Sequence, residues 1–165
     1  MKMIKRISNK DMDTYFELSS LYEEEFAPLT GAKRNENGHY PVSTPIDKAH
    51  IGYFIFDADE EKGFIVINTE KDPYDVCEFF ILKEYRNQGL GQRLAFTVFD
   101  AHNVNWSVKQ LYSAERARAF WIKVIGKYTE GNYTEQLYED EKWGRVYMQL
   151  FSSNSLLKKP SLQCL

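Results

Sequence analysis

The sequence has few cysteines, no long apolar run and no excess of basic residues. Cys77 and Cys164 are the two cysteines among 165 residues, which excludes the disulfide framework typical of small secreted domains. No apolar stretch approaches the roughly 18 residues that a membrane-spanning helix needs. The residues after Met1 also lack the apolar core of a signal peptide. These absences favour a cytoplasmic protein and argue against a membrane protein.

The charge balance is slightly acidic, with 21 Lys and Arg against 24 Asp and Glu and a net charge of −3. Proteins that bind the phosphate backbone of nucleic acid usually carry a basic excess, so we expect no nucleic-acid partner. His39, His50 and His102 lie far apart in sequence and lack the spacing of metal ligands. We therefore expect no metal, and we interpret each histidine as a surface or hydrogen-bonded residue.

Apolar and aromatic side chains are plentiful, at 43% and 15% of the residues. A chain of this length and composition can bury one hydrophobic core. We expect a single domain over residues 1–151. Residues 152–165 are polar apart from one pair of leucines, and we interpret them as a mobile tail or a short docking segment.

The hydrophobic patterns predict one α/β domain with a mixed sheet and helices against it. The expected strands are residues 3–8, 51–56, 64–68, 76–82, 106–112, 133–138 and 145–151, with a hairpin loop over 57–63. The expected helices are residues 11–26, 92–102 and 116–125, the last of them capped by Gly126. Strand 76–82 is almost continuously apolar, which predicts a central strand buried on both faces.

Two polar segments near the N-terminus allow functional interpretations. Glu23, Glu24 and Glu25 lie on the last turn of the first expected helix, as a solvated face or as an acidic rim for a cationic ligand. Residues 28–45 hold three prolines and form a long loop, and loops of this length often bind ligands. We place part of an acceptor site there.

The segment Arg86-Asn87-Gln88-Gly89-Leu90-Gly91-Gln92 follows the buried strand and opens a helix. The first turn of a helix has backbone N–H groups without partners and a partial positive charge, which together bind anions. Glycine lets the backbone approach a phosphate without a Cβ in the way. Arg86 and Arg93 add positive charge. The segment therefore predicts a pyrophosphate site.

Other interpretations of this segment are weaker. A dinucleotide-binding fingerprint needs a third glycine where Leu94 stands, and a P-loop needs Lys where Gln92 stands. A tight strand-to-helix connection without any ligand is the remaining structural alternative for the bare motif.

The segment in its context resembles motif A of the GNAT (Gcn5-related N-acetyltransferase) superfamily. The resemblance rests on Arg86-x-x-Gly89-x-Gly91 after an apolar strand, and on Ala114 to Trp121, which is similar to the Asn-x-x-Ala-x-x-Phe-Tyr segment of the family. It covers residues 51–151 and extends to a bacterial subgroup of predicted acetyltransferases. It implies the GNAT fold, a mostly antiparallel central sheet with splayed strands and flanking helices.

The resemblance implies acetyl-coenzyme A (acetyl-CoA) as co-substrate and a primary amine of a small molecule or peptide as acceptor. Direct transfer would occur in a ternary complex. The backbone of 86–92 would hold the pyrophosphate, Phe80, Ile81 and Leu82 would pair with the pantetheine arm, and an N–H near Ile81 would stabilise the oxyanion. Phe120 and Trp121 would line the pantetheine channel. Because many members are dimers, a homodimer is one option.

Glu78 is the one charged side chain in strand 76–82. Burial would raise the pKa of its carboxyl and suit it to act as general base; the alternative is a structural partner of a basic group or backbone amide. Trp121 and Ala114 replace the family's Tyr and Asn, and an indole cannot protonate the leaving thiolate. Tyr128 and Tyr133 are the candidate acids, with solvent as the alternative. We interpret Cys77 as a core residue.

Two rival functions remain. A non-catalytic module that binds or senses acyl-CoA is consistent with the replacements at 114 and 121. A fold that binds the phosphates of another nucleotide is the second rival.

Overall fold

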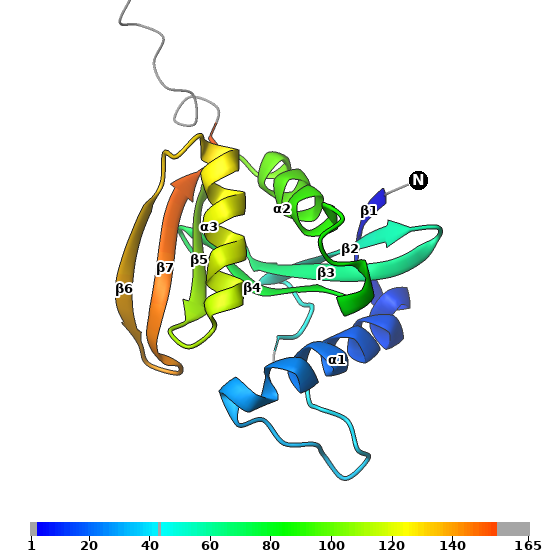
Figure 1. Ribbon diagram of the computed structural model, residues 1–165. Helices are drawn as coiled ribbons and strands as arrows, with labels where there is room; N and C mark the ends of the chain where they lie inside the picture. The colour runs from blue at the N-terminus through cyan, green and yellow to red at the C-terminus, as the bar shows by residue number, and fades with distance from the viewer. Residues whose placement is uncertain (1–2, 43, 155–165) are drawn as a thin grey trace, which may run out of the picture. The chain divides into compact units, whose positions relative to one another are not determined.

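The computed structural model describes residues 3–42 and 44–154, which form seven strands and three α-helices (Figure 1). The strands are β1 (Met3–Arg6), β2 (His50–Asp57), β3 (Glu60–Asn68), β4 (Tyr74–Ile81), β5 (Asn105–Leu111), β6 (Thr134–Asp140) and β7 (Gly144–Ser152). The helices are α1 (Met12–Thr30), α2 (Leu90–Ala101) and α3 (Glu115–Thr129). Short 3₁₀ helices, Asn9–Asp11 and Lys83–Tyr85, precede α1 and α2.

The strands form one mixed sheet in the order β1-β2-β3-β4-β5-β7-β6, so β4 is the central strand. The pairings β1–β2, β2–β3, β5–β7 and β6–β7 are antiparallel, whereas β4 and β5 are parallel. The β4–β5 ladder covers three residue pairs, from Tyr74–Trp106 to Val76–Val108, and is shorter than either strand. The predicted α/β class and mostly antiparallel sheet with splayed strands are confirmed.

The chain divides into two compact units, and each has its own core. Unit 1 comprises Met1–Asn68 and Cys77–Leu94, and unit 2 comprises Thr69–Val76 and Ala95–Leu165. In unit 1 the core includes Tyr15, Leu18, Phe54, Phe64 and Phe80. In unit 2 it includes Val98, Phe99, Trp106, Ile125 and Phe151, and α3 lies over β5 and β7 (Figure 1). One domain over 1–151 stays a prediction, and tail residues 155–165 lie outside the described residues.

The β2–β3 hairpin has a tighter turn than its sequence indicates. Ala58 and Asp59 both have positive φ, at 52° and 62°, as in the two-residue type I′ turns that match the twist of paired strands. The expected loop over 57–63 is therefore wrong, because residues 60–63 already belong to β3. Lys62 is polar yet buried: its Nζ lies 2.6 Å from a carboxylate oxygen of Glu60 and 4.1 Å from the ring centroid of Tyr85.

Two helices extend beyond their expected ends. α1 includes Pro28 and ends at Gly31, which has φ 73° and donates its N–H to the Ala27 carbonyl at 2.8 Å. The long loop therefore starts at residue 31 and ends at 49. α3 continues through Gly126 and ends at Glu130, which has φ 53°. The assignment of Gly126 as the C-cap is wrong, because the left-handed residue that stops the helix comes four positions later.

No helix in the described ranges, 3–42 and 44–154, is long and apolar enough to cross a membrane.

Gly63 and Gly126 form a matched pair for testing this packing. A Cβ at Gly63 would lie 2.3 Å from the Phe80 carbonyl oxygen, whereas the nearest atom to a Cβ at Gly126 is on the Tyr133 ring at 3.7 Å. We expect Gly63→Ala to lower the free energy of unfolding by about 1–3 kcal/mol through overpacking. Gly126→Ala should raise it by about 0.5–1 kcal/mol, because alanine favours a helix interior. Urea denaturation measures both, and equal effects would contradict the structure.

Candidate functional site

The turn between β4 and α2 presents the start of a helix in an exposed position. Asn87 and Gly89 have positive φ, at 61° and 79°, and both are exposed. The Arg93 N–H donates to the Gly89 carbonyl at 3.1 Å as the helix begins. Leu90, Gly91 and Gln92 precede Arg93 in the first turn of α2. The helix itself therefore supplies no carbonyl to accept a hydrogen bond from their N–H groups. The first turn of α2 carries no acidic residue.

This turn has the features that a phosphate group requires. No heavy atom lies within 4 Å of the position that a Cβ would take at Gly89, so the space beside its backbone is open. Its φ of 79° also strains any residue with a side chain. Backbone N–H groups at a helix N-terminus without acidic residues complete an anion-binding arrangement. The residues present therefore fit the predicted pyrophosphate, with Gly89 as the position least tolerant of change.

Arg86 has a different environment from the one that its sequence position implies. Its Nε donates to the Ile81 carbonyl at 2.8 Å, and its two terminal nitrogens donate to the Glu25 carboxylate at 2.6 Å each. Its backbone N–H donates to the Lys83 carbonyl at 3.4 Å. The guanidinium thus joins α1 to the end of β4. Its geometry indicates that Arg86 shapes the turn, and its contact with a phosphate stays a prediction.

The end of β4 is also held by β3. The Leu82 N–H donates to the Lys62 carbonyl at 2.8 Å, and Phe80 and Ile81 are buried. The Ile81 carbonyl and the Leu82 N–H therefore have partners within unit 1. Pairing of this edge with a ligand arm, and the N–H near Ile81 as an oxyanion donor, stay predictions.

The three glutamates at the end of α1 are not equivalent. Glu24 pairs with Arg34 at 2.6 Å, Glu25 pairs with Arg86, and Glu23 is buried, with 7% of its surface exposed. Neither a solvated face nor an exposed acidic rim describes all three residues. The reason is tertiary, because the partners come from the following loop and from the turn after β4.

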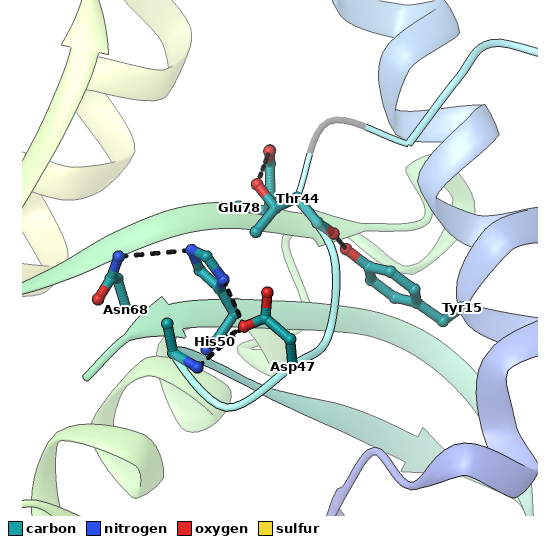
Figure 2. A network of polar contacts seen from close by, with 7 residues as sticks. Tyr15, Thr44, Asp47, His50, Asn68 and Glu78 are labelled. Carbon is teal, nitrogen blue, oxygen red and sulfur yellow. Dashed lines mark hydrogen bonds and ion pairs between the residues drawn. The ribbon is translucent and has the colours of Figure 1, made fainter. Parts of the chain in front are cut away.

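Glu78 is a buried carboxylate whose partners include hydroxyl groups from two other elements. It is 8% exposed on β4. The Thr44 hydroxyl donates to its Oε1 at 2.8 Å, and the Tyr15 hydroxyl donates to the Thr44 carbonyl at 2.6 Å (Figure 2). The same carboxylate acts on the phenol of Tyr22 on α1. Burial, and after it the charge of Glu78, raise the pKa of both Tyr15 and Tyr22, so both phenols keep their protons at neutral pH.

Thr44, Tyr15 and Tyr22 were not singled out from the sequence as site residues. The loop 28–45 was expected to contribute to a site, and Thr44 is the loop residue that reaches β4. Tyr15 and Tyr22 lie on the inward face of α1, with Tyr15 in the core of unit 1 and Tyr22 packed against it. Which strand residue that face would meet depends on the tertiary fold.

His50 is a hydrogen-bonded residue, as expected. Its Nδ1 lies 2.8 Å from Asp47 Oδ1 and its Nε2 lies 3.4 Å from Asn68 Nδ2 (Figure 2). Asp47 also accepts hydrogen bonds from the backbone N–H groups of Ala49 and His50, at 2.9 and 3.0 Å. The hydrogen bond from His50 is the main reason that the pKa of Asp47 is lowered. Asp47 thus anchors the end of the loop to the start of β2.

The candidate residues on α3 belong to unit 2 and have largely aromatic surroundings. Trp121 is buried, with ring centroids 5.1 Å from Phe120 and 6.4 Å from Phe99. Tyr128 is buried and donates its hydroxyl to Asp100 at 2.7 Å. Burial, and after it this hydrogen bond, raise the pKa of Tyr128. A phenol whose proton is held by a carboxylate is a poorer acid, so the geometry favours a structural role for Tyr128.

The structure brings the sequence candidates together in two groups. Unit 1 holds Glu78, Phe80, Ile81, Leu82 and the turn 86–92, and unit 2 holds Phe120, Trp121 and Tyr128. Across residues 3–42 and 44–154, no group of three or more His, Cys, Asp or Glu side chains could hold a metal ion.

Solved structures with a similar fold include acetyltransferases. The ribosomal-protein-S18-alanine N-acetyltransferase of Escherichia coli superposes with a TM-score of 0.60 at 10% identity, over 100% of this chain and 99% of that one. An acetyltransferase of the GNAT family from Streptococcus pneumoniae gives 0.59 at 14% identity, over 92% and 99%. A Bacillus subtilis acetyltransferase in complex with CoA gives 0.59 at 8% identity, over 92% and 99%. No family model and no curated protein sequence matches the chain.

Tyr128→Phe tests the structural role of the phenol. Its raised folded-state pKa contributes stability that is present in full below the pKa of an unfolded tyrosine, about 10, and is lost as the pH rises through the folded-state value. We expect the variant to be less stable than the parent by about 1 kcal/mol at pH 7. That difference should shrink between pH 10 and 11 in urea denaturation. A constant difference across this range would contradict the assignment.

Proposed function

We propose that this chain, which has the fold of the GNAT N-acetyltransferases, transfers an acetyl group from acetyl-CoA to a primary amine. The observation that carries the proposal is the turn from β4 into α2, where a helix N-terminus without acidic residues follows an exposed, left-handed glycine. The shared fold supports acetyl-CoA over other ligands with a pyrophosphate, since the compared acetyltransferases include one in complex with CoA.

The donor end of the proposed site belongs to the turn. The backbone N–H groups of residues 87–92 would hold the pyrophosphate, and Gly89 leaves the space for it. Phe80, Ile81 and Leu82 would supply the strand edge for the pantetheine arm. Acetyl-CoA supplies the activated thioester, so the protein needs no nucleophile of its own and acts mainly by orienting the two reactants.

Glu78 is the proposed general base. The reaction forms a bond between the amine nitrogen and the acetyl carbon and breaks the bond to sulfur, so the nitrogen must give up a proton. Glu78 would take that proton, directly or through one water. The leaving sulfur would be protonated by solvent, because the Tyr128 hydroxyl is bonded to Asp100. The acceptor would be a small-molecule or peptide amine, and the proposed compartment is the cytoplasm.

A second candidate is a module that binds acyl-CoA without transferring it. The observation that favours it is the pair of replacements on α3. Ala114, at the N-cap of α3, makes no side-chain capping hydrogen bond, and Trp121 is buried among aromatic rings. The two candidates share the donor site and differ at Glu78.

Acetyl-CoA binding is tested by thermal stabilisation. A ligand at 100 times its dissociation constant adds about 2.7 kcal/mol of stability, so acetyl-CoA should raise the melting temperature, and ATP and NAD should not. Gly89→Val should abolish this shift. Gly131→Val is the matched control, because Gly131 has φ 83° and open space around it but lies after α3. It should lower the melting temperature and keep the acetyl-CoA shift. Stabilisation by ATP or NAD instead would overturn the donor assignment.

Catalysis is tested by the thiol released from acetyl-CoA in the presence of propylamine, lysine, spermidine or an alanine-terminated peptide. We expect acceptor-dependent release by the parent and a loss of about 10²- to 10⁴-fold in Glu78→Gln, with acetyl-CoA binding unchanged. Glu139→Gln, an exposed strand glutamate, should retain full activity. Binding without release for every amine would support the sensing module and exclude the enzyme for these acceptors.

A further inference from the structure

Three elements of unit 1 meet at the carboxylate of Glu78. β4 carries the carboxylate, the loop 31–49 brings the Thr44 hydroxyl to 2.8 Å from Oε1, and α1 contributes Tyr22. Figure 2 shows the Thr44 side chain directed at Glu78 while the Tyr15 hydroxyl points to the Thr44 backbone. A carboxylate that accepts a hydrogen bond from Thr44 and interacts with the phenol of Tyr22 has a restricted orientation.

We propose that Thr44 and Tyr22 are positioning residues that hold the Glu78 carboxylate in the orientation and ionisation state needed to accept a proton. The inference rests on the proposed function, because it takes Glu78 as the general base. It adds to that function two residues on elements that the donor site does not use, and it gives the loop 31–49 a definite role.

The burial of Glu78 explains why these hydroxyls matter. With 8% of its surface exposed, the carboxylate has little water to replace a lost donor. Hydrogen bonds to a charged group are stronger than those between neutral groups, and they favour the charged form. Tyr22 can serve as a donor throughout the physiological range, because burial and the Glu78 charge keep its proton in place.

The position of Thr44 is itself held from both sides. The Tyr15 hydroxyl donates to its carbonyl at 2.6 Å, and Tyr15 is fully buried in the core of unit 1. Three residues later, Asp47 binds two backbone N–H groups and the ring of His50 at the start of β2. The loop therefore presents the Thr44 hydroxyl from a defined position.

A purely structural role would predict a different result from the same variants. If the Thr44 hydroxyl only fastens the loop to β4, removing it lowers stability and leaves the turnover of the folded enzyme unchanged. If it positions the base, turnover falls while the affinity for acetyl-CoA does not. Thr44→Val removes the hydroxyl at nearly constant volume, and Thr44→Ser restores it.

The kinetic experiment compares the purified parent, Thr44→Val, Thr44→Ser and Tyr22→Phe. It uses acetyl-CoA and whichever amine of the panel above gives the fastest release. We expect kcat to fall about 10- to 100-fold in Thr44→Val and about 10-fold in Tyr22→Phe, with the KM for acetyl-CoA unchanged. Thr44→Ser should recover most of the activity. Thr134→Val, on the exposed edge strand β6, is the control and should match the parent.

A second measurement needs no acceptor amine. The ¹³C chemical shift of the Glu78 side-chain carboxyl is followed against pH by NMR in the parent and in Thr44→Val. Tyr15 and Tyr22 on α1 interact electrostatically with this carboxyl, and both stay protonated over the range used. Glu23 on α1 acts in turn on both phenols. Loss of the hydroxyl should move the titration midpoint up by about one pH unit.

These experiments distinguish failure of the positioning role from failure of the proposed function, acetyl transfer with Glu78 as general base. Full activity in Glu78→Gln would refute the base assignment. An inactive Glu78→Gln with a fully active Thr44→Val would refute the positioning role alone. If no amine is acetylated, the proposed transfer activity fails and the NMR titration alone tests the positioning role. An unchanged midpoint in Thr44→Val then overturns that role, and a raised midpoint supports the hold of Thr44 on the Glu78 carboxylate.

Discussion

The hydrogen bonds of the Arg86 guanidinium are the contacts on which the proposed donor site depends. The guanidinium joins the carbonyl at the end of β4 to a carboxylate on α1 through three hydrogen bonds of 2.6 to 2.8 Å. The exposed turn that follows contains a left-handed asparagine and a left-handed glycine, and a turn of this kind needs a fixed starting point. Because arginine presents its donors in a rigid planar fork, the pairing also fixes an orientation, which a lysine would not do.

The acidic side chains of unit 1 differ in the kind of partner they have. Glu24 and Glu25 pair with arginines, whereas Glu78 is held by hydroxyl groups and stays buried. A carboxylate paired with an arginine has its charge compensated and accepts a proton less readily, whereas a hydroxyl donor lowers the pKa of a carboxylate by less and leaves its charge uncompensated. This difference in partners is the physical reason to place the proposed base at Glu78 and not at Glu24 or Glu25.

Unit 2 has a polar network on the same helix that carries the aromatic candidates. Arg118 on α3 pairs with Glu135 at 2.6 Å, Glu135 accepts a hydrogen bond from Gln149, and Gln149 and Gln110 bond to each other through both amides. Buried polar groups that satisfy one another in this way specify one packing arrangement. Trp121 and Tyr128 face the rings of the core instead. Both residues therefore contribute to stability, whatever their part in ligand binding.

The sequence by itself determined the order of elements and the central position of β4, and it predicted an anion site at residues 86–92. These follow from local rules, since periodicity, glycine and helix starts depend on neighbouring residues. Local rules failed at Gly126, because α3 continues past it to the left-handed residue Glu130. They also failed over residues 57–63, because Ala58 and Asp59 alone make the turn of the β2–β3 hairpin. Only the tertiary structure decided that Arg86 pairs with Glu25, 61 residues away, and that Thr44 and Tyr22 meet Glu78. Contacts between residues so far apart in sequence are set by how the elements pack, which no local pattern of side chains records.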